Sequence, residues 1–160
     1  MIFVTVGIQT PFDRLLRTVD DWAGLRCRAG VFAQVGESGY RGRHIITAKF
    51  LAPLEYRRRV ETAQFVVAHA GMGSIITALE LGKPIIVMPR RGDLSETRND
   101  HQIATAKHFI QHPGIAVAFN ERELFEKLDQ ADTLSGTEPI RADASPLLIE
   151  ALRAFLRGEA

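Results

Sequence analysis

Short runs of apolar residues alternate along this chain with longer segments in which apolar side chains recur at helical spacing. Strands that are buried on both faces by helices read as continuous apolar runs, and such strands belong to parallel sheets. The pattern therefore predicts an α/β fold, a Rossmann-like, doubly wound parallel sheet of about six strands. The predicted strands are residues 2–6, 31–35, 45–48, 65–68, 85–88 and 115–118.

Helix-starting residues mark several of the segments between these strands. Thr10 precedes Pro11 and Asp13, an order typical of an N-cap followed by a proline and an acid in the first turn. Asn120 and Glu123 form a capping box for a later helix. Other helices are predicted to start at residue 53 and to cover 75–81, 100–109 and, near the C-terminus, about 145–157. We expect the last of these to be available for packing on a partner.

Composition narrows the class of protein. The chain has 160 residues, 46% hydrophobic and 24% charged, so we expect a single domain over residues 1–160 with one nucleotide-binding lobe. Twenty basic residues against nineteen acidic ones give a net charge of +1, which predicts no nucleic-acid partner. One cysteine forms no internal disulfide, and neither a signal peptide nor a membrane-spanning run is evident, so we expect a cytoplasmic protein.

The segment after the predicted strand 65–68 resembles a phosphate-binding loop in composition. His69, Gly71, Gly73 and Ser74 lead from that strand into a helix, whose N-terminus offers unpaired N–H groups to an anion. Ser74 could either cap the helix or bond a phosphate oxygen. A bare Gly-x-Gly-Ser is a weak motif, and the alternative is a tight turn with Ser74 as cap. The sequence contains neither the third glycine of a dinucleotide fingerprint nor a P-loop.

A long polar loop follows the predicted strand 85–88. Residues 89–99 are more than a tight connection needs, and long ordered loops at strand ends are often functional. Arg90 and Arg91 suit phosphate or carboxylate, while Asp100, His101 and Gln102 open the next helix with groups that suit sugar hydroxyls. The alternative is a solvated helix start beside a scattered basic surface.

Taken together, these segments resemble the donor-binding half of GT-B glycosyltransferases, the family 28 C-terminal domain. The resemblance rests on residues 69–74 (HAGMGS), 78–84 (ALELGKP) and 100–102 (DHQ). It extends to the C-terminal domain of the transferase that adds GlcNAc to lipid I. Residues 3–7 and 11–15 look closer to small stand-alone subunits, namely the catalytic subunit of the dolichol-linked UDP-GlcNAc transferase and its bacterial exopolysaccharide relatives.

The resemblance implies a single GT-B half that binds a nucleoside diphosphate sugar, usually UDP-linked, as a donor substrate and needs no cofactor. Carried over residue by residue, it places Gly7 beside the diphosphate. It assigns His69, Gly71, Gly73 and Ser74 to the principal phosphate loop.

The same resemblance implies contacts to the rest of the donor. It assigns the backbone of Phe50 and Leu51 to the uracil ring, and the segment Asp100, His101 and Gln102 to the sugar. The family often has a glutamate that binds the ribose hydroxyls, and this chain has Thr77 at that position. The resemblance therefore does not settle which residue binds the ribose hydroxyls.

The family mechanism implied is an inverting, metal-independent transfer. No Asp-x-Asp occurs in the sequence, so the metal-chelating arrangement of GT-A enzymes is not predicted and no metal site is expected. The helix near Ser74, with Arg90 or Arg91, would stabilise charge on the leaving nucleotide. The two arginines would equally suit the carboxylate of a uronic acid donor. We expect the base to come from a partner, with His69 as the candidate in this chain.

The leading hypothesis is a glycosyltransferase subunit that works with a membrane-associated, acceptor-binding subunit at the inner face of the membrane. Together they would transfer a hexosyl, N-acetylhexosaminyl or glucuronosyl group to a polyprenyl-linked saccharide in exopolysaccharide or glycan synthesis. One alternative is a non-catalytic accessory module of a partner transferase, and another is a stand-alone sugar-nucleotide epimerase or hydrolase. Residues 57–59 (RRR) form either a solvated helix face or a contact for anionic lipid or an acidic partner.

Overall fold

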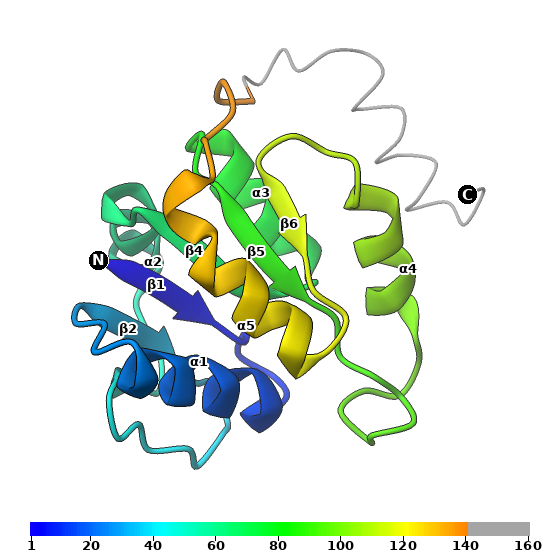
Figure 1. Cartoon of the computed structure of the whole chain (residues 1–160). Helices are drawn as coiled ribbons and strands as arrows, with labels where there is room; N and C mark the ends of the chain where they lie inside the picture. Colours follow the sequence, from blue (N-terminus) through cyan, green and yellow to red (C-terminus); the bar gives the residue numbers. More distant parts are fainter. Residues whose placement is uncertain (141–160) are drawn as a thin grey trace.

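A computed structural model describes residues 1–140 and has at its centre a six-stranded sheet in the order β3-β2-β1-β4-β5-β6 (Figure 1). The strands are β1 (Ile2–Thr5), β2 (Val31–Gln34), β3 (Ile46–Ala48), β4 (Phe65–His69), β5 (Ile85–Met88) and β6 (Ile115–Val117). The helices are α1 (Asp13–Leu25), α2 (Pro53–Thr62), α3 (Met72–Glu80), α4 (His101–Phe109) and α5 (Glu121–Asp129), followed by the 3-10 turn η1 (Ala131–Thr133). All neighbouring strands are parallel, which confirms the predicted Rossmann-like α/β class.

Helices cover both faces of the sheet and create two apolar cores. Along β1, Ile2 and Val4 belong to the core that includes side chains of α1 and α5, while Phe3 belongs to the core of α2, α3 and α4. Full burial of one such side chain contributes about 1.5–3 kcal/mol. The strands read as continuous apolar runs because both of their faces are covered in this way.

Most of the predicted boundaries agree with the structure. Each predicted strand matches an observed one to within one residue at either end. The capping box of α5 is confirmed, since the Asn120 side chain accepts a hydrogen bond from the Glu123 amide at 2.9 Å. Helix α3 begins three residues earlier than predicted, and the predicted C-terminal helix at 145–157 lies outside the described residues.

The start of α1 differs from the prediction. The helix begins at Asp13 with Phe12 as its N-cap and no side-chain cap, so Thr10 does not cap it. The carbonyl of Thr10 instead accepts a hydrogen bond from Arg90, and the Phe12 ring is buried in the core. These long-range contacts set the start of the helix and override the local preference for a polar N-cap.

The strand order reverses between β1 and β4. From β1 the chain moves outward through β2 and β3, and then returns to place β4 on the other side of β1. In open α/β sheets, the ligand crevice lies outside the carboxyl ends of the strands at such a reversal. This edge, where β1 ends at Thr5 and β4 at His69, is therefore the place to look for a site.

Candidate functional site

A cavity of about 830 Å³ lies at this edge of the sheet, a size within the usual range for small-ligand sites. Its walls come from the last residues of β1, β2 and β4, from the loop after β1, from the first two turns of α2 and α3, and from the loop between β5 and α4 together with the start of α4. The lining residues are Thr5, Val6, Gly7, Ile8, Gln9, Thr10, Gln34, Leu51, Pro53, Tyr56, His69, Gly73, Ser74, Thr77, Arg90, Thr97 and Gln102.

A larger groove of about 950 Å³ runs between α1 and α5 on one helical face. Several charged residues that line it already pair with one another, as Arg14 does with Glu121 and Arg122 with Glu126. It lies away from the strand ends and contains none of the predicted site residues. The cavity at the strand ends is therefore the candidate site.

The N-terminus of α3 opens into this cavity. The helix starts at Met72, so the backbone N–H groups of Met72, Gly73 and Ser74 have no carbonyl four residues earlier within the helix. Such groups, with the positive end of the helix dipole, favour an anion. Ser74 does not cap the helix, because it is the third residue of α3 and no side-chain cap is present. Its buried hydroxyl instead accepts a hydrogen bond from the Tyr56 hydroxyl at 3.3 Å.

The three glycines of the predicted site have different physical reasons to be glycine. A Cβ at Gly71 would lie 2.1 Å from Nε2 of His69, so the His69 ring leaves no room for one. Gly7 has a φ of +77°, and a Cβ there would lie 3.0 Å from Cε1 of the same ring. A Cβ at Gly73 would meet no atom within 4 Å, so packing does not explain this glycine. Because Gly73 lines the cavity, it leaves space beside the α3 N-terminus for a ligand.

His69 is the last residue of β4 and projects into the site. Burial lowers the pKa of His69 to about 4, and the positive charge of Arg90 acts in the same direction. The imidazole is therefore neutral at physiological pH, and its buried Nδ1 has no hydrogen-bond partner among the described residues. A neutral ring suits hydrogen bonding to a ligand, whereas a pKa this far below 7 suits base catalysis poorly.

The two adjacent arginines have different surroundings. Arg90 lines the cavity, is only 5% exposed, and donates through Nη2 to the carbonyl oxygens of Val6, at 2.6 Å, and of Thr10. Arg91 does not line the cavity, and its guanidinium pairs with Asp93. The sequence suggests either arginine for an anion and predicts Arg91 as the donor-binding one, but the structure brings Arg90 to the cavity and leaves Arg91 outside its lining.

The segment predicted to meet the sugar divides in the same way. Gln102 lines the cavity, and its Oε1 accepts a hydrogen bond from the Arg90 amide at 3.1 Å. Asp100 does not line it, and its Oδ1 accepts from the Gly92 amide at 3.0 Å. His101 is exposed and lies outside the cavity lining. The sugar-binding role of this segment stays a prediction.

The predicted base and ribose contacts lie on the α2 and α3 side of the site. Leu51 and Thr77 line the cavity. Phe50, which precedes Leu51 in the sequence, is 47% exposed and is not part of the lining. The Thr77 hydroxyl donates to the Gly73 carbonyl at 2.8 Å. Glu80, the nearest acid, pairs with Arg57 and does not line the cavity. Two arginines of the cluster at residues 57–59 thus form ion pairs within the protein, Arg57 with Glu80 and Arg59 with Glu55.

Sequence reasoning missed several polar residues of the cavity. Thr5 and Gln34 end the apolar strands β1 and β2, and the Oε1 of Gln34 is buried without a hydrogen-bond partner among residues 1–140. A polar residue at the carboxyl end of an apolar run was the signal that could have identified both. Tyr56 had no comparable signal, because only the packing of α2 against α3 brings its hydroxyl to Ser74.

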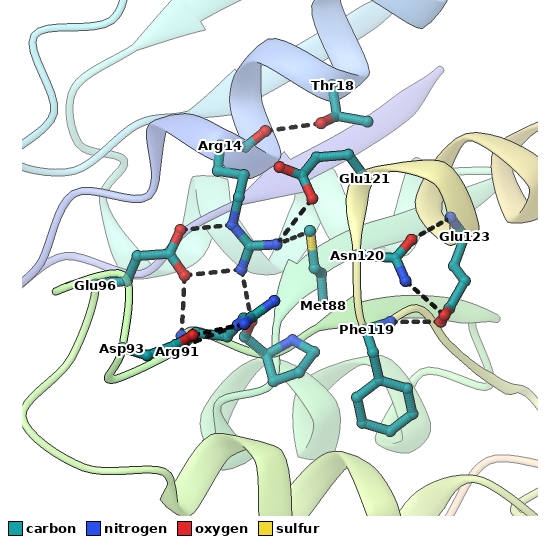
Figure 2. A network of polar contacts seen from close by, with 11 residues as sticks. Arg14, Thr18, Met88, Arg91, Asp93, Glu96, Phe119, Asn120, Glu121 and Glu123 are labelled. Carbon is teal, nitrogen blue, oxygen red and sulfur yellow. Dashed lines mark hydrogen bonds and ion pairs between the residues drawn. The ribbon is translucent and has the colours of Figure 1, made fainter.

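A polar network holds the loop between β5 and α4 (Figure 2). Arg14 of α1 donates through Nε and Nη2 to the two carboxylate oxygens of Glu96, at 2.6 and 2.8 Å, and through Nη2 to the Pro89 carbonyl at 3.2 Å. Glu96 also accepts a hydrogen bond from the Arg91 amide at 2.9 Å. A forked arginine–carboxylate pair of this kind is geometrically specific, so it fixes the loop that carries Thr97 into the cavity.

Residues 1–140 match the model of the glycosyltransferase family 28 C-terminal domain. The chain belongs to this family. The family that the sequence motifs predicted is thereby confirmed.

Solved structures show the same fold. The chain is similar to the crystal structure of the kitacinnamycin glycotransferase, with a TM-score of 0.62 and 18% identity over 98% of this chain and 38% of that one. It is also similar to the solution NMR structure of ALG13, with a TM-score of 0.63 and 20% identity over 94% of each chain. The spinosyn forosaminyltransferase SpnP gives a TM-score of 0.55 at 18% identity and is covered over 42% of its length. The chain thus spans less than half of two of these three proteins.

Proposed function

We propose that this chain is the donor-binding subunit of a glycosyltransferase that uses a UDP-sugar. The observation that carries the proposal is the α3 N-terminus, which opens with Gly73 into a cavity at the switch point of a family 28 domain. A diphosphate is the ligand group that such a helix start suits best. The cavity volume of about 830 Å³ accommodates a ligand of nucleotide-sugar size.

The proposed reaction is an inverting transfer without a metal. As the bond between the sugar and the diphosphate breaks, negative charge builds on the leaving nucleotide, and preorganised N–H donors at Met72, Gly73 and Ser74 would stabilise it. Thr77 would contact the ribose through its hydroxyl, and Leu51 the uracil ring. With a pKa of about 4, His69 would act as a neutral hydrogen-bonding group.

We propose that a partner subunit supplies the acceptor site and the catalytic base. Large apolar side chains stand exposed around the cavity: Ile8, which lines it, is 58% exposed, and Leu54, next to the lining residue Pro53, is 84% exposed. Apolar surface beside a functional pocket is typical of a protein contact. Among residues 1–140 no helix has the length and hydropathy of a membrane span. In the proposed assembly, the partner therefore brings the chain to a polyprenyl-linked saccharide at the cytosolic face of a membrane, as in exopolysaccharide synthesis.

Calorimetry of the purified chain with UDP and a panel of UDP-sugars tests the proposal. We expect UDP to bind with a Kd below 1 mM, and the panel of UDP-GlcNAc, UDP-glucose, UDP-galactose and UDP-glucuronate to rank the sugars. Folded protein that binds none of them at millimolar concentration would contradict the proposal. The panel also tests whether the donor carries a uronic acid. The structure does not single out an arginine for its carboxylate, because Arg91 pairs with Asp93 and Arg90 donates to backbone carbonyls.

The alternative of a non-catalytic accessory module is favoured by one feature, the Thr77 that replaces the family's usual acid. In that case the chain would support transfer by its partner without holding the donor. Phosphate-loop substitutions would then leave transfer unchanged in the reconstituted pair, whereas a donor-binding subunit would lose it.

A further inference from the structure

Arg90 is a buried cation that has no carboxylate partner among residues 1–140. It lies two residues after the end of β5 and is 5% exposed, and none of the ion pairs formed by the described residues includes it. The carboxylate whose charge acts on it is that of Glu96, which is already engaged by Arg14 and by the Arg91 amide. Within the described part of the chain, the hydrogen bonds of the Arg90 guanidinium go to neutral groups.

The contacts of Arg90 leave part of the guanidinium unused. Nη2 donates to the carbonyl oxygens of Val6 and Thr10, and the guanidinium carbon lies 5.1 Å from the centre of the Phe12 ring. Nε is buried and has no hydrogen-bond partner among the described residues. Burial lowers the pKa of Arg90 to about 10, so the group still carries its charge at neutral pH.

A buried charge of this kind is unfavourable unless an opposite charge accompanies it. Removing an ion from water costs several kcal/mol in a protein, and carbonyl dipoles and an aromatic face offset only part of that cost. An anionic ligand in the cavity that Arg90 lines would supply the counter-charge that Arg90 lacks among residues 1–140.

The position of Arg90 in the sheet places it beside the α3 N-terminus. His69, which precedes the turn into α3, is paired in register with Met88, the last residue of β5, and Arg90 lies two residues beyond Met88 in the loop that follows. The amide of Ala70 donates to the Met88 carbonyl at 3.1 Å, which ties the two strand ends together. The N–H groups of α3 and the guanidinium therefore serve one site from adjacent strands.

We propose that Arg90 is the resident counter-ion of the donor's diphosphate, a fixed cation that binds the phosphate oxygens together with the α3 N-terminus. The inference rests on the proposed function and adds a residue to it. Arg90 also holds the carbonyls of Val6 and Thr10, which flank Gly7, Ile8 and Gln9 in the cavity wall. Binding of the diphosphate and ordering of this loop therefore depend on the same guanidinium.

The test compares uridine, UDP and inorganic pyrophosphate as ligands of the wild type, Arg90→Met and Arg90→Lys. Uridine lacks the diphosphate, so Arg90→Met should leave its affinity unchanged while it weakens UDP and pyrophosphate binding by about ten- to a hundredfold. Arg90→Lys keeps the charge but not the planar fork, so its affinity for UDP and pyrophosphate should lie between that of the wild type and that of Arg90→Met. The matched control is Arg122→Met, since Arg122 is exposed and pairs with Glu126 on α5.

The outcomes separate this inference from the proposed function. If the wild type binds UDP and Arg90→Met binds it as tightly, or loses uridine and UDP in equal measure, the counter-ion role is wrong and the donor-binding function stands. If the wild type binds neither uridine nor UDP but binds pyrophosphate through Arg90, the nucleotide proposal fails and the anion site stands. If it binds no pyrophosphate or UDP, both are wrong.

A second measurement does not depend on whether the variants fold. The Nε–H resonance of Arg90 in the wild-type chain can be followed by ¹⁵N NMR during titration. We expect UDP and pyrophosphate to shift it and uridine to leave it in place. An Nε–H signal that does not respond to saturating UDP would overturn the counter-ion role.

Discussion

At the scale of single residues, the site is arranged around the His69 ring. The ring leaves no room for a Cβ at Gly71 and crowds one at Gly7, whose φ of +77° already disfavours a side chain, so the fold itself accounts for these two glycines. Gly73 is different, because the space around it is open and faces the cavity. One motif thus contains a glycine that packing requires and another that leaves space open beside the cavity.

Gly73→Ala should therefore stabilise the protein and weaken ligand binding. Gly73 lies in α3, where alanine is favoured over glycine by about 0.5–1 kcal/mol, and no atom obstructs the added methyl group. The same methyl group occupies the approach to the helix N-terminus, so we expect UDP affinity to fall about tenfold or more. Chemical denaturation and calorimetry measure the two effects.

The matched control is Gly39→Ala, which also adds a methyl group to open space but lies outside the cavity. It should leave UDP binding unchanged. Equal UDP affinity in Gly73→Ala and the wild type would show that the phosphate does not approach α3 at this residue.

At the scale of elements, two long connections are held by charged side chains of α1. Arg14 holds the loop between β5 and α4 through Glu96, and Asp20 holds the connection between β2 and β3. Asp20 is fully buried, and its carboxylate accepts hydrogen bonds from the Tyr40 hydroxyl at 2.6 Å and from the amides of Arg43 and His44 at 2.8 and 2.7 Å. Neither loop has apolar periodicity of its own, so these contacts provide its order.

Asp20→Asn should destabilise the protein in a pH-dependent way. Burial alone would raise the pKa of Asp20, but the hydrogen bonds from Arg43, Tyr40 and His44 outweigh it and lower the pKa below the usual value of about 3.9. A lowered pKa in the folded state means stability that is present above about pH 4 and is lost as the carboxylate protonates at lower pH.

We therefore expect Asp20→Asn to lower the free energy of unfolding by about 1.5–3 kcal/mol at pH 7, because an amide cannot accept all three donors. The difference from the wild type should shrink as the pH falls below about 4. Urea denaturation at pH 7, 5 and 3 measures it, with Asp21→Asn as the control, since that carboxylate is half exposed and pairs with Arg43. A difference that is constant with pH would contradict the role of the Asp20 charge.

At the scale of the whole molecule, the candidate cavity lies at the carboxyl ends of the strands. The chain covers 38% and 42% of the length of two glycosyltransferases that share its fold, and nearly the whole length of ALG13. Exposed apolar side chains, Ile8 and Leu54 among them, stand beside this edge. Under the proposed function, these side chains would contact the partner subunit that faces the cavity.

Leu54→Ser should separate donor binding from transfer. The side chain is 84% exposed, so its removal should change stability by less than about 0.5 kcal/mol and leave UDP affinity unchanged. Transfer of labelled sugar from UDP-sugar into lipid extracts, by membranes supplemented with the purified chain, should fall several-fold. The control is Leu25→Ser, which removes another exposed leucine, at the end of α1. Unchanged transfer with Leu54→Ser would place the partner contact elsewhere.

The sequence by itself determined the fold class, the strand boundaries and the position of the glycine-containing turn that leads from β4 into α3. These features depend on local patterns, namely apolar runs, helical spacing and glycine at a turn, which are read directly from neighbouring residues. The capping box at Asn120 was predictable for the same reason, because its two partners are three residues apart.

Only the tertiary structure decided which residues of a motif face the cavity. Arg90 and Arg91 are adjacent and chemically alike, yet Arg90 enters the site because its guanidinium reaches the carbonyls of Val6 and Thr10, about eighty residues away in the chain. The low pKa of His69 and the open space at Gly73 likewise arise from burial and from the approach of distant segments. Such contacts depend on how the strands are ordered in space, and no local pattern in the sequence records that order.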